Sequence, residues 1–168
     1  MPERALAAYA GASLAEAQKN PGCHLGWNTL AAIGQVESAH GTLGGATTGV
    51  DGVATPAIIG RALDGHGVAK IPDTDHGRLD GDTTWDHAVG PLQFTPATWA
   101  THAQDGNHDG VTDINNIDDA ALAAAGYLCR SGDLTVARNW IAAVTAYNPD
   151  PAYTNKVADA ANSYAPVG

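Results

Sequence analysis

The sequence is poor in glutamate and in basic residues. Three of its eighteen acidic residues are glutamates, and the eight lysines and arginines leave a net charge of −10. This balance argues against nucleic acid or an anionic membrane as the main partner. The sequence also lacks an apolar run long enough to span a bilayer, a zinc-binding spacing, a nucleophile elbow, a P-loop and a dinucleotide fingerprint. These absences leave few of the common metal, nucleotide and serine-hydrolase chemistries open.

Cysteine is scarce as well. Cys23 and Cys129 each lie beside the end of a predicted helix, and there is no C-x-x-C pair. An even count permits one disulfide and an exported protein, and two buried free thiols are the alternative. A bridge would close a loop of about 100 residues, worth on the order of 4–5 kcal/mol in the chain-entropy model. No segment resembles a signal peptide, so we expect an extracellular or cell-wall protein whose signal has been removed.

The pattern of apolar residues predicts a mainly helical, all-α single domain over residues 1–168. We expect helices over 4–19, 28–40, 96–102, 118–130, 135–147 and from 151 onward. Helical periodicity is lost between 41 and 89, where Gly, Thr and Asp dominate, and 56–63 is expected to form a short turn or helix. A connection this long tends to be functional or mobile, so we interpret it as an insertion loop beside a groove.

Glu37 lies in an unusual place within its predicted helix. On a helical wheel it falls between Leu30 and Ile33, inside the apolar arc, and His40-Gly41 reads as the helix end. Desolvation and the negative end of the helix dipole both raise the pKa of such a carboxyl group. It could therefore serve as a general acid, although a snorkelling side chain or half of an ion pair would give the same pattern. Of the three glutamates, it alone is placed on an apolar face.

An Asp-rich segment after the 96–102 helix matches an EF-hand calcium loop. Its oxygen ligands and backbone carbonyl fall at the expected positions, with Gly110 at the sixth. The predicted ligands are Asp105, Asn107, Asp109, Val111, Asp113 and Asn116. Asn116 replaces the usual bidentate Glu, which predicts weak affinity, and Asp118 or Asp119 could compensate. A metal-free Asx turn that caps the next helix is the alternative.

Four segments occur in a telling order: Val36-Glu37-Ser38, then 90–96 with the sequence GPLQFTP, then the calcium-like loop, then Ala146-Tyr147-Asn148. Together they resemble the lytic transglycosylases of bacterial cell walls, in particular the membrane-bound lytic transglycosylase B type in its actinobacterial form. The resemblance covers about 27–164. It implies a lysozyme-like fold, peptidoglycan strands as the partner, a monomer, and no cofactor for chemistry beyond a structural calcium ion.

The resemblance also implies roles for particular residues. Glu37 would protonate the glycosidic oxygen between N-acetylmuramic acid and N-acetylglucosamine, and then act as base while the muramoyl C6 hydroxyl attacks C1 to give a 1,6-anhydro sugar. The substrate-binding residues would be Thr84, Gln93, Tyr127, Tyr147 and Asn148.

Two other functions remain open at this stage. A lysozyme-like hydrolase would need a second carboxylate at a defined distance, and Asp80, Asp82 and Asp86 are available in the long loop. A non-catalytic wall-binding module stapled by calcium would need none of this chemistry. Gln93 could also merely satisfy backbone groups, and Tyr147 could be a core residue.

Overall fold

The computed structural model describes residues 1–164 of the 168-residue chain. The helices are α1 (Glu3–Lys19), α2 (Trp27–Ser38), α3 (Pro96–His102), α4 (Ile117–Cys129), α5 (Ala137–Tyr147) and α6 (Pro151–Tyr164). Between α2 and α3 lie the 3-10 turn η1 (Leu43–Gly45) and four short strands: β1 (Thr47–Thr48), β2 (Ala54–Thr55), β3 (Ile59–Ala62) and β4 (His87–Val89). The mainly helical, lysozyme-like fold class predicted from the sequence is confirmed.

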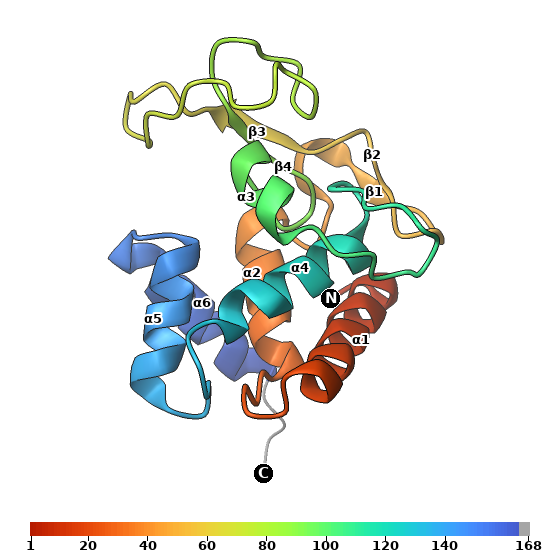
Figure 1. Cartoon of the computed structure of the whole chain (residues 1–168), viewed down its shortest axis with the longest axis vertical. Coiled ribbons are helices and arrows are strands. Elements are labelled where there is room, and N and C mark those ends of the chain that lie inside the picture. Colours follow the sequence, from red (N-terminus) through yellow and green to blue (C-terminus); the bar gives the residue numbers. More distant parts are fainter. Residues whose placement is uncertain (165–168) are drawn as a thin grey trace.

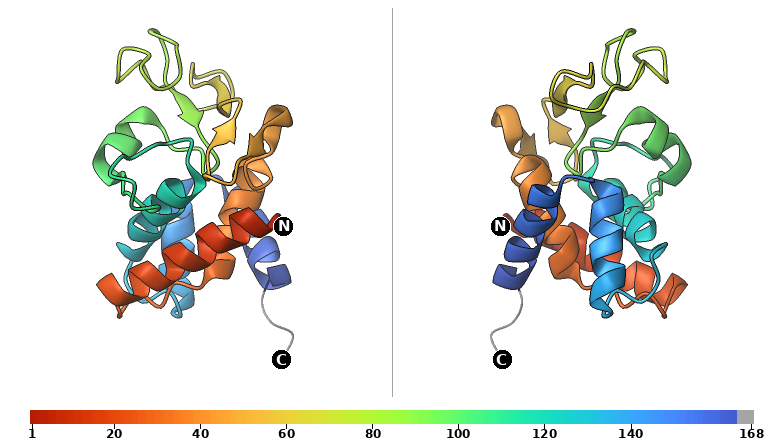
Figure 2. Two further views of the ribbon diagram at one scale, coloured as in Figure 1. Left: turned by 90° about the vertical axis from the view of Figure 1, so that its right-hand side faces the viewer. Right: turned by 90° about the vertical axis from the view of Figure 1, so that its left-hand side faces the viewer.

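The molecule has two parts along its long axis (Figures 1 and 2). The helices α1, α2, α4, α5 and α6 lie at one end, and the strands and long loops between α2 and α3 lie at the other. The strands form two small antiparallel pairs, β1 with β2 and β3 with β4. The prediction of a turn or helix over 56–63 is wrong, because Ile59–Ala62 instead pairs with β4 and alternates between exposed and half-buried residues.

The helix boundaries follow local capping chemistry. Thr95 caps α3, since its hydroxyl accepts the Thr98 N–H and Pro96 occupies the first helical position. Helix α2 begins at Trp27, and the amide of the next residue, Asn28, donates to the Ala161 carbonyl on α6. Left-handed backbone at Ala39 ends α2.

Helix α2 lies at the centre of the core. Its residues from Leu30 to Ile33 are fully buried, and it packs most extensively against α6, while α1 packs against the alanine-rich α4. Gly34 lets the Tyr9 ring reach α2, because a Cβ at this position would lie 2.0 Å from the Tyr9 hydroxyl. The core therefore fixes the direction of α2 and the position of its last turn, which carries Glu37.

The two cysteines form a disulfide, as the sequence predicted. The Cys23–Cys129 bridge spans 106 residues and joins the α1–α2 connection to the end of α4. Among residues 1–164, every helix is too short or too polar to cross a bilayer.

Candidate active site

Glu37 occupies the last turn of α2 and has one strong partner. The hydroxyl of Tyr153, at the start of α6, donates to its Oε1 at 2.6 Å. Burial raises the pKa of Glu37 from an ordinary 4.5 to about 7, and the hydrogen bond from Tyr153 opposes part of that rise. The direction of the shift is the one predicted from the helical wheel. Near neutral pH this carboxyl group can both give and take a proton.

Burial does not single out Glu37 among the glutamates, however. Glu16 on α1 retains only 3% of its exposure and is more buried than Glu37. The expectation that Glu37 alone lies on an apolar face is therefore wrong. What distinguishes Glu37 is its place at a helix end beside Tyr153 and the other tyrosines described below.

Sequence reasoning missed the role of Tyr153. This residue is buried on α6 together with Val157. Its hydroxyl, however, reaches a carboxylate 116 residues earlier in the chain. The one available signal was that a buried tyrosine hydroxyl needs a hydrogen-bond partner.

Residues 90–94 form a tight turn that carries Gln93. Gly90 has φ +79°, and a Cβ there would lie 2.0 Å from the Ile114 carbonyl oxygen, so no larger residue fits. Gln93 also has left-handed backbone, at φ +53°. Its backbone N–H and its side-chain amide both donate to the Gly90 carbonyl, at 3.1 and 3.0 Å. A non-glycine residue held in this conformation is typical of sites where the surrounding structure fixes a functional side chain.

Two side chains from distant elements hold this turn. The Ser38 hydroxyl, at the end of α2, donates to the Pro91 carbonyl at 2.6 Å, and the Tyr147 hydroxyl, at the end of α5, donates to the Leu92 carbonyl at 2.8 Å. Ser38, the residue after Glu37, and Tyr147 thus donate hydrogen bonds to adjacent carbonyl groups of the turn. The segments aligned in the sequence therefore meet in space.

A small cavity joins Gln93 to two of the predicted tyrosines. It measures about 110 Å³ and is lined by Gln93, Phe94, Thr95, Thr98, Tyr127, Ala146 and Tyr147. The rings of Tyr127 and Tyr147 meet edge to face, with centroids 5.6 Å apart. Burial raises the pKa of the Tyr147 hydroxyl, and the charge of Glu37 adds to the rise.

A family model, described as the transglycosylase SLT domain, matches residues 4–163. The chain belongs to this family. No curated protein and no solved structure gives a match. Members of the SLT family are lytic transglycosylases, which are glycosidic-bond lyases acting on peptidoglycan. This SLT domain is therefore an enzyme that acts on the bacterial cell wall, outside the cytoplasm.

Asn148 and Thr84 of the SLT domain stand apart from the cluster. The Asn148 side chain accepts the Asp150 N–H at 3.1 Å in the connection between α5 and α6, and Asp150 in turn accepts the Ala152 N–H at the start of α6. Thr84 is exposed on the long loop, and its hydrogen bonds to Asp82 and Asp73 involve only its backbone. Neither residue makes a hydrogen bond with Glu37, and their sugar-binding roles remain predictions.

The three loop aspartates considered as a second catalytic carboxylate all have structural partners. Asp86 is fully buried and accepts both the N–H and the hydroxyl of Thr74. Asp80 accepts the His87 N–H at 2.8 Å, and Asp82 contacts the His87 ring at 3.2 Å. Burial lowers the pKa of His87, but the Gly60 carbonyl and the carboxylates of Asp82 and Asp80 outweigh it and raise the pKa above its ordinary value. These carboxylates shape the loop between β3 and β4.

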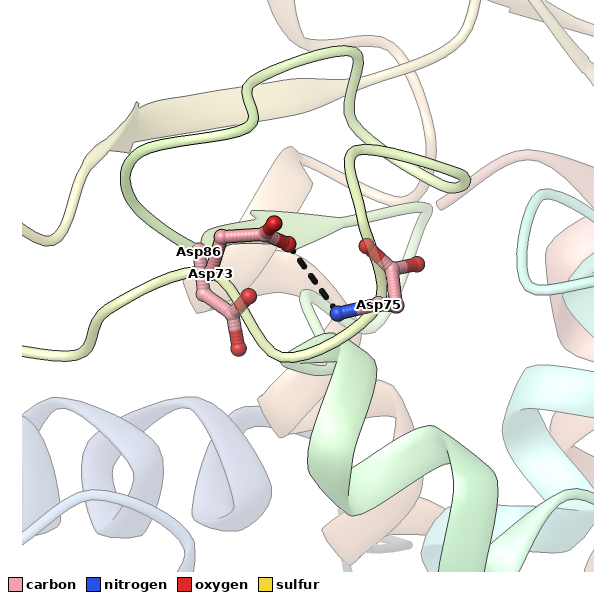
Figure 3. A group of neighbouring side chains, drawn as sticks. All are labelled: Asp73, Asp75 and Asp86. Atoms are coloured by element: carbon pink, nitrogen blue, oxygen red, sulfur yellow. Dashed lines mark hydrogen bonds between the residues drawn. The ribbon is translucent and has the colours of Figure 1, made fainter.

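Asp86 also belongs to an acidic cluster with Asp73 and Asp75 (Figure 3). Within residues 1–164 it is the single set of three acidic, histidine or cysteine side chains whose ligand atoms lie within 4.8 Å of one another. Asp73 already accepts the backbone N–H groups of Asp75, marked by the dashed line, and of Gly77. Backbone donors thus account for the cluster without a metal ion.

The Asp-rich loop has the turn geometry expected of a calcium loop. Asp105 accepts the N–H of Gly110 at 2.9 Å, and Gly110 has φ +88°. Asp109 accepts the Val111 N–H at 2.8 Å, and Asp113 accepts the Asn115 N–H at 2.8 Å. These carboxylates accept N–H groups of their own loop, which is the Asx-turn arrangement of the metal-free alternative as well as of a calcium loop.

At the closing position of the loop, Asn116 makes the helix-capping turn given above as the alternative, and Asp119 takes the place facing the loop. The Asn116 oxygen accepts the Asp118 N–H and so caps α4, while its amide donates to Asp51. The buried Asp119 carboxylate instead faces the loop and accepts the N–H groups of Gly106 and Asp113 at 2.7 and 2.8 Å. Asp119, rather than Asn116, therefore places its carboxylate at the closing end of the loop.

The steric constraint on the 90–94 turn can be tested with two glycines that have similar positive φ angles, Gly90 and Gly81. Gly90→Ala forces Ile114 and the turn apart, so transglycosylase activity should fall about 100-fold, as for other ångström-scale displacements of a binding group. Gly81→Ala is the control, because Gly81 has a similar φ of +82° but open space around it. Activity on purified sacculi, with circular dichroism to verify folding, is the measurement. Equal activity of the two variants would contradict the role of the turn.

Proposed function

We propose that this SLT domain is a lytic transglycosylase of the membrane-bound lytic transglycosylase B type, in its actinobacterial form. It would cleave the β-1,4 bond between N-acetylmuramic acid and N-acetylglucosamine and leave 1,6-anhydro ends. The observation that carries the proposal is the carboxyl group of Glu37, whose pKa burial raises to about 7 and which accepts a hydrogen bond from Tyr153.

A single carboxyl group accounts for both proton transfers. Protonated Glu37 donates its proton to the glycosidic oxygen as the bond from that oxygen to C1 breaks, and N-acetylglucosamine leaves with a free hydroxyl group. The resulting Glu37 carboxylate then takes the proton of the muramoyl C6 hydroxyl, whose oxygen bonds to C1. Glu37 ends protonated as it began, and no water is consumed. A pKa near the working pH favours both steps.

The partners of the loop aspartates favour this route over hydrolysis. A two-carboxylate hydrolase needs a second Asp or Glu free to hold water or attack C1. Asp80, Asp82 and Asp86 all accept backbone or side-chain donors of their own loop. The substrate's own C6 hydroxyl supplies the nucleophile without any of them.

The remaining sugar contacts are proposed from the cavity beside Gln93. The amide nitrogen of Gln93 is bound to the turn, which leaves its oxygen to accept from a sugar. The hydroxyl groups of Tyr127 and Tyr147 donate to backbone carbonyls, so these residues would offer their rings to the glycan. Thr84 and Asn148 complete the proposed set at its edges. The disulfide supports an exported protein, and we expect it to act as a monomer.

Glu37→Gln tests the proposal most simply. The amide keeps the shape of the carboxyl group but cannot transfer a proton, so turnover on purified sacculi should fall roughly 10²–10⁴-fold while binding persists. Mass spectrometry of wild-type products should find 1,6-anhydro ends. Reducing ends would instead identify a hydrolase, and unchanged turnover of Glu37→Gln would remove this residue from the mechanism.

The hydrogen bond from Tyr153 makes a signed prediction about pH. Because the reaction needs protonated Glu37, kcat/KM should decline as the pH rises through about 7. Tyr153→Phe removes a donor that favours the carboxylate, so the pKa of Glu37 rises further and the decline moves to higher pH. Tyr164→Phe is the control, since Tyr164 lies on the same helix but donates to Gln35. A decline that stays in place, or moves to lower pH, would count against Tyr153 as the partner of the acid.

We also propose a structural calcium ion in the Asp-rich loop. Its ligands would come from Asp105, Asn107, Asp109 and the Val111 carbonyl, with Asp119 replacing the predicted Asn116 at the closing end. Asp113 would contribute at the ninth position. Calcium would neutralise the acidic loop and fix the start of α4; it has no part in the proton transfers.

Calcium should raise the melting temperature. With a dissociation constant of roughly 10⁻⁴–10⁻³ M, about 10 mM calcium should raise it on the order of 5 °C. Asp105→Asn should abolish the rise, and Asp64→Asn, which removes the same charge from the loop after β3, should not. Differential scanning calorimetry with calcium and with a chelator measures both. A calcium effect of the same size in both variants would rule out this loop as the site.

A further inference from the structure

A polar groove runs along the junction of α2 and α6, outside the cluster around Glu37. Its volume is about 490 Å³, and its lining residues are Gln35, Val36, Lys156, Asp159, Ala160 and Ser163. Gln35, Lys156, Asp159 and Ser163 are exposed, so the groove offers an amide, an ammonium, a carboxylate and a hydroxyl group to a ligand.

The groove adjoins the catalytic acid on both helices. On α2, Val36 directly precedes Glu37. On α6, Lys156 follows Tyr153 by three residues, or about 4.5 Å along the helix axis. A polymer whose scissile bond lies at Glu37 can therefore place a branch of the adjoining unit in this groove.

Lys156 is an unpaired cation in a strongly acidic protein. Within residues 1–164, no carboxylate forms a salt bridge with its ammonium group. Within the same residues Arg4 is the one lysine or arginine that pairs with a carboxylate, that of Asp118, so Lys156 is distinguished by its place at this groove. Asp159 lies three residues along α6 but does not pair with Lys156. At a net charge of −10, an unpaired ammonium beside the active site is a favourable place for an anionic group.

We propose that this groove binds the peptide stem of the substrate, with Lys156 pairing with a stem carboxylate. The inference rests on the proposed function. Muramic acid carries its acidic peptide through a lactyl ether, so the peptide branches from the sugar unit that holds the reacting C1. Lys156 then makes the enzyme select strands that still carry stems over bare glycan.

The cavity on the opposite side of α6 is a poorer fit for this branch. It is larger, at about 640 Å³, but it is lined mainly by apolar groups that include Trp140 and Ile141. A charged peptide would lose its hydration there without gaining a counter-charge.

The test compares two forms of one polymer. Glycan strands bearing stems, and the same strands stripped by an amidase, are digested by the wild type, Lys156→Ala, Lys156→Arg and Lys19→Ala. Lys19→Ala is the matched control, because it removes an exposed lysine from the end of α1. The readout is the ratio of kcat/KM for stem-bearing strands to kcat/KM for bare strands, with melting curves to verify folding.

We expect the wild type to favour stem-bearing strands, and Lys156→Ala to lower the ratio roughly three- to fivefold, the upper end of the range for an exposed ion pair. Lys156→Arg should restore the ratio, Lys19→Ala should keep it, and added salt should reduce the preference of the wild type. A wild type that cleaves both polymers with equal efficiency, or equal ratios for the two alanine variants, overturns this inference alone. A wild type inactive on both polymers overturns the proposed function with it.

Discussion

Desolvation of one carboxyl group is the constraint on which the site depends. Glu37 lies half-buried where α2 ends, and the Tyr153 hydroxyl of α6 donates to its carboxyl group. Burial raises the pKa of Glu37 by disfavouring its charged form. The hydrogen bond from Tyr153 stabilises the charged form and so opposes part of that rise. The balance leaves a group that changes charge near neutral pH, which is the property that a lone acid and base needs.

The other contacts of the site fix the position of Gln93, the proposed sugar-binding residue. Ser38 and Tyr147 bind neighbouring carbonyls of the 90–94 turn, so the end of α2 and the end of α5 are tied to the segment that carries Gln93. The core fixes α2, and α2 fixes both Glu37 and Ser38. The position of Gln93 relative to Glu37 is therefore set by the helical part. The loops between α2 and α3 lie at the other end of the molecule (Figure 1).

Much of this arrangement could be predicted from the sequence. Apolar periodicity and capping signals located every helix to within a few residues, and the apolar surroundings of Glu37 indicated its raised pKa. Paired β-strands in a Gly- and Asp-rich loop could not be predicted, because Ile59–Ala62 is too short for a clear alternation and its partner lies 25 or more residues later. The burial of Glu16 shows that periodicity alone cannot rank acids by function.

Contacts between distant residues were the harder part. The pairing of Tyr153 with Glu37 could not be predicted, because the Tyr153 hydroxyl meets the acid only after α6 packs on α2. Asn116 fitted the calcium pattern by number, yet its side chain caps α4, and Asp119 faces the loop instead. Helix packing and competition between capping and ligation decided these cases, and neither can be read from spacing alone.

The three glutamates allow a direct test of the central claim. Carbon-13 labelling of glutamate side chains gives three carboxyl resonances, from Glu3, Glu16 and Glu37, and comparison with Glu37→Gln identifies the third. Followed by NMR across the pH range, the Glu37 signal should titrate near pH 7. A midpoint at the ordinary value of about 4.5 would contradict the account, because a carboxyl group that is fully ionised at neutral pH cannot supply the proton that breaks the glycosidic bond.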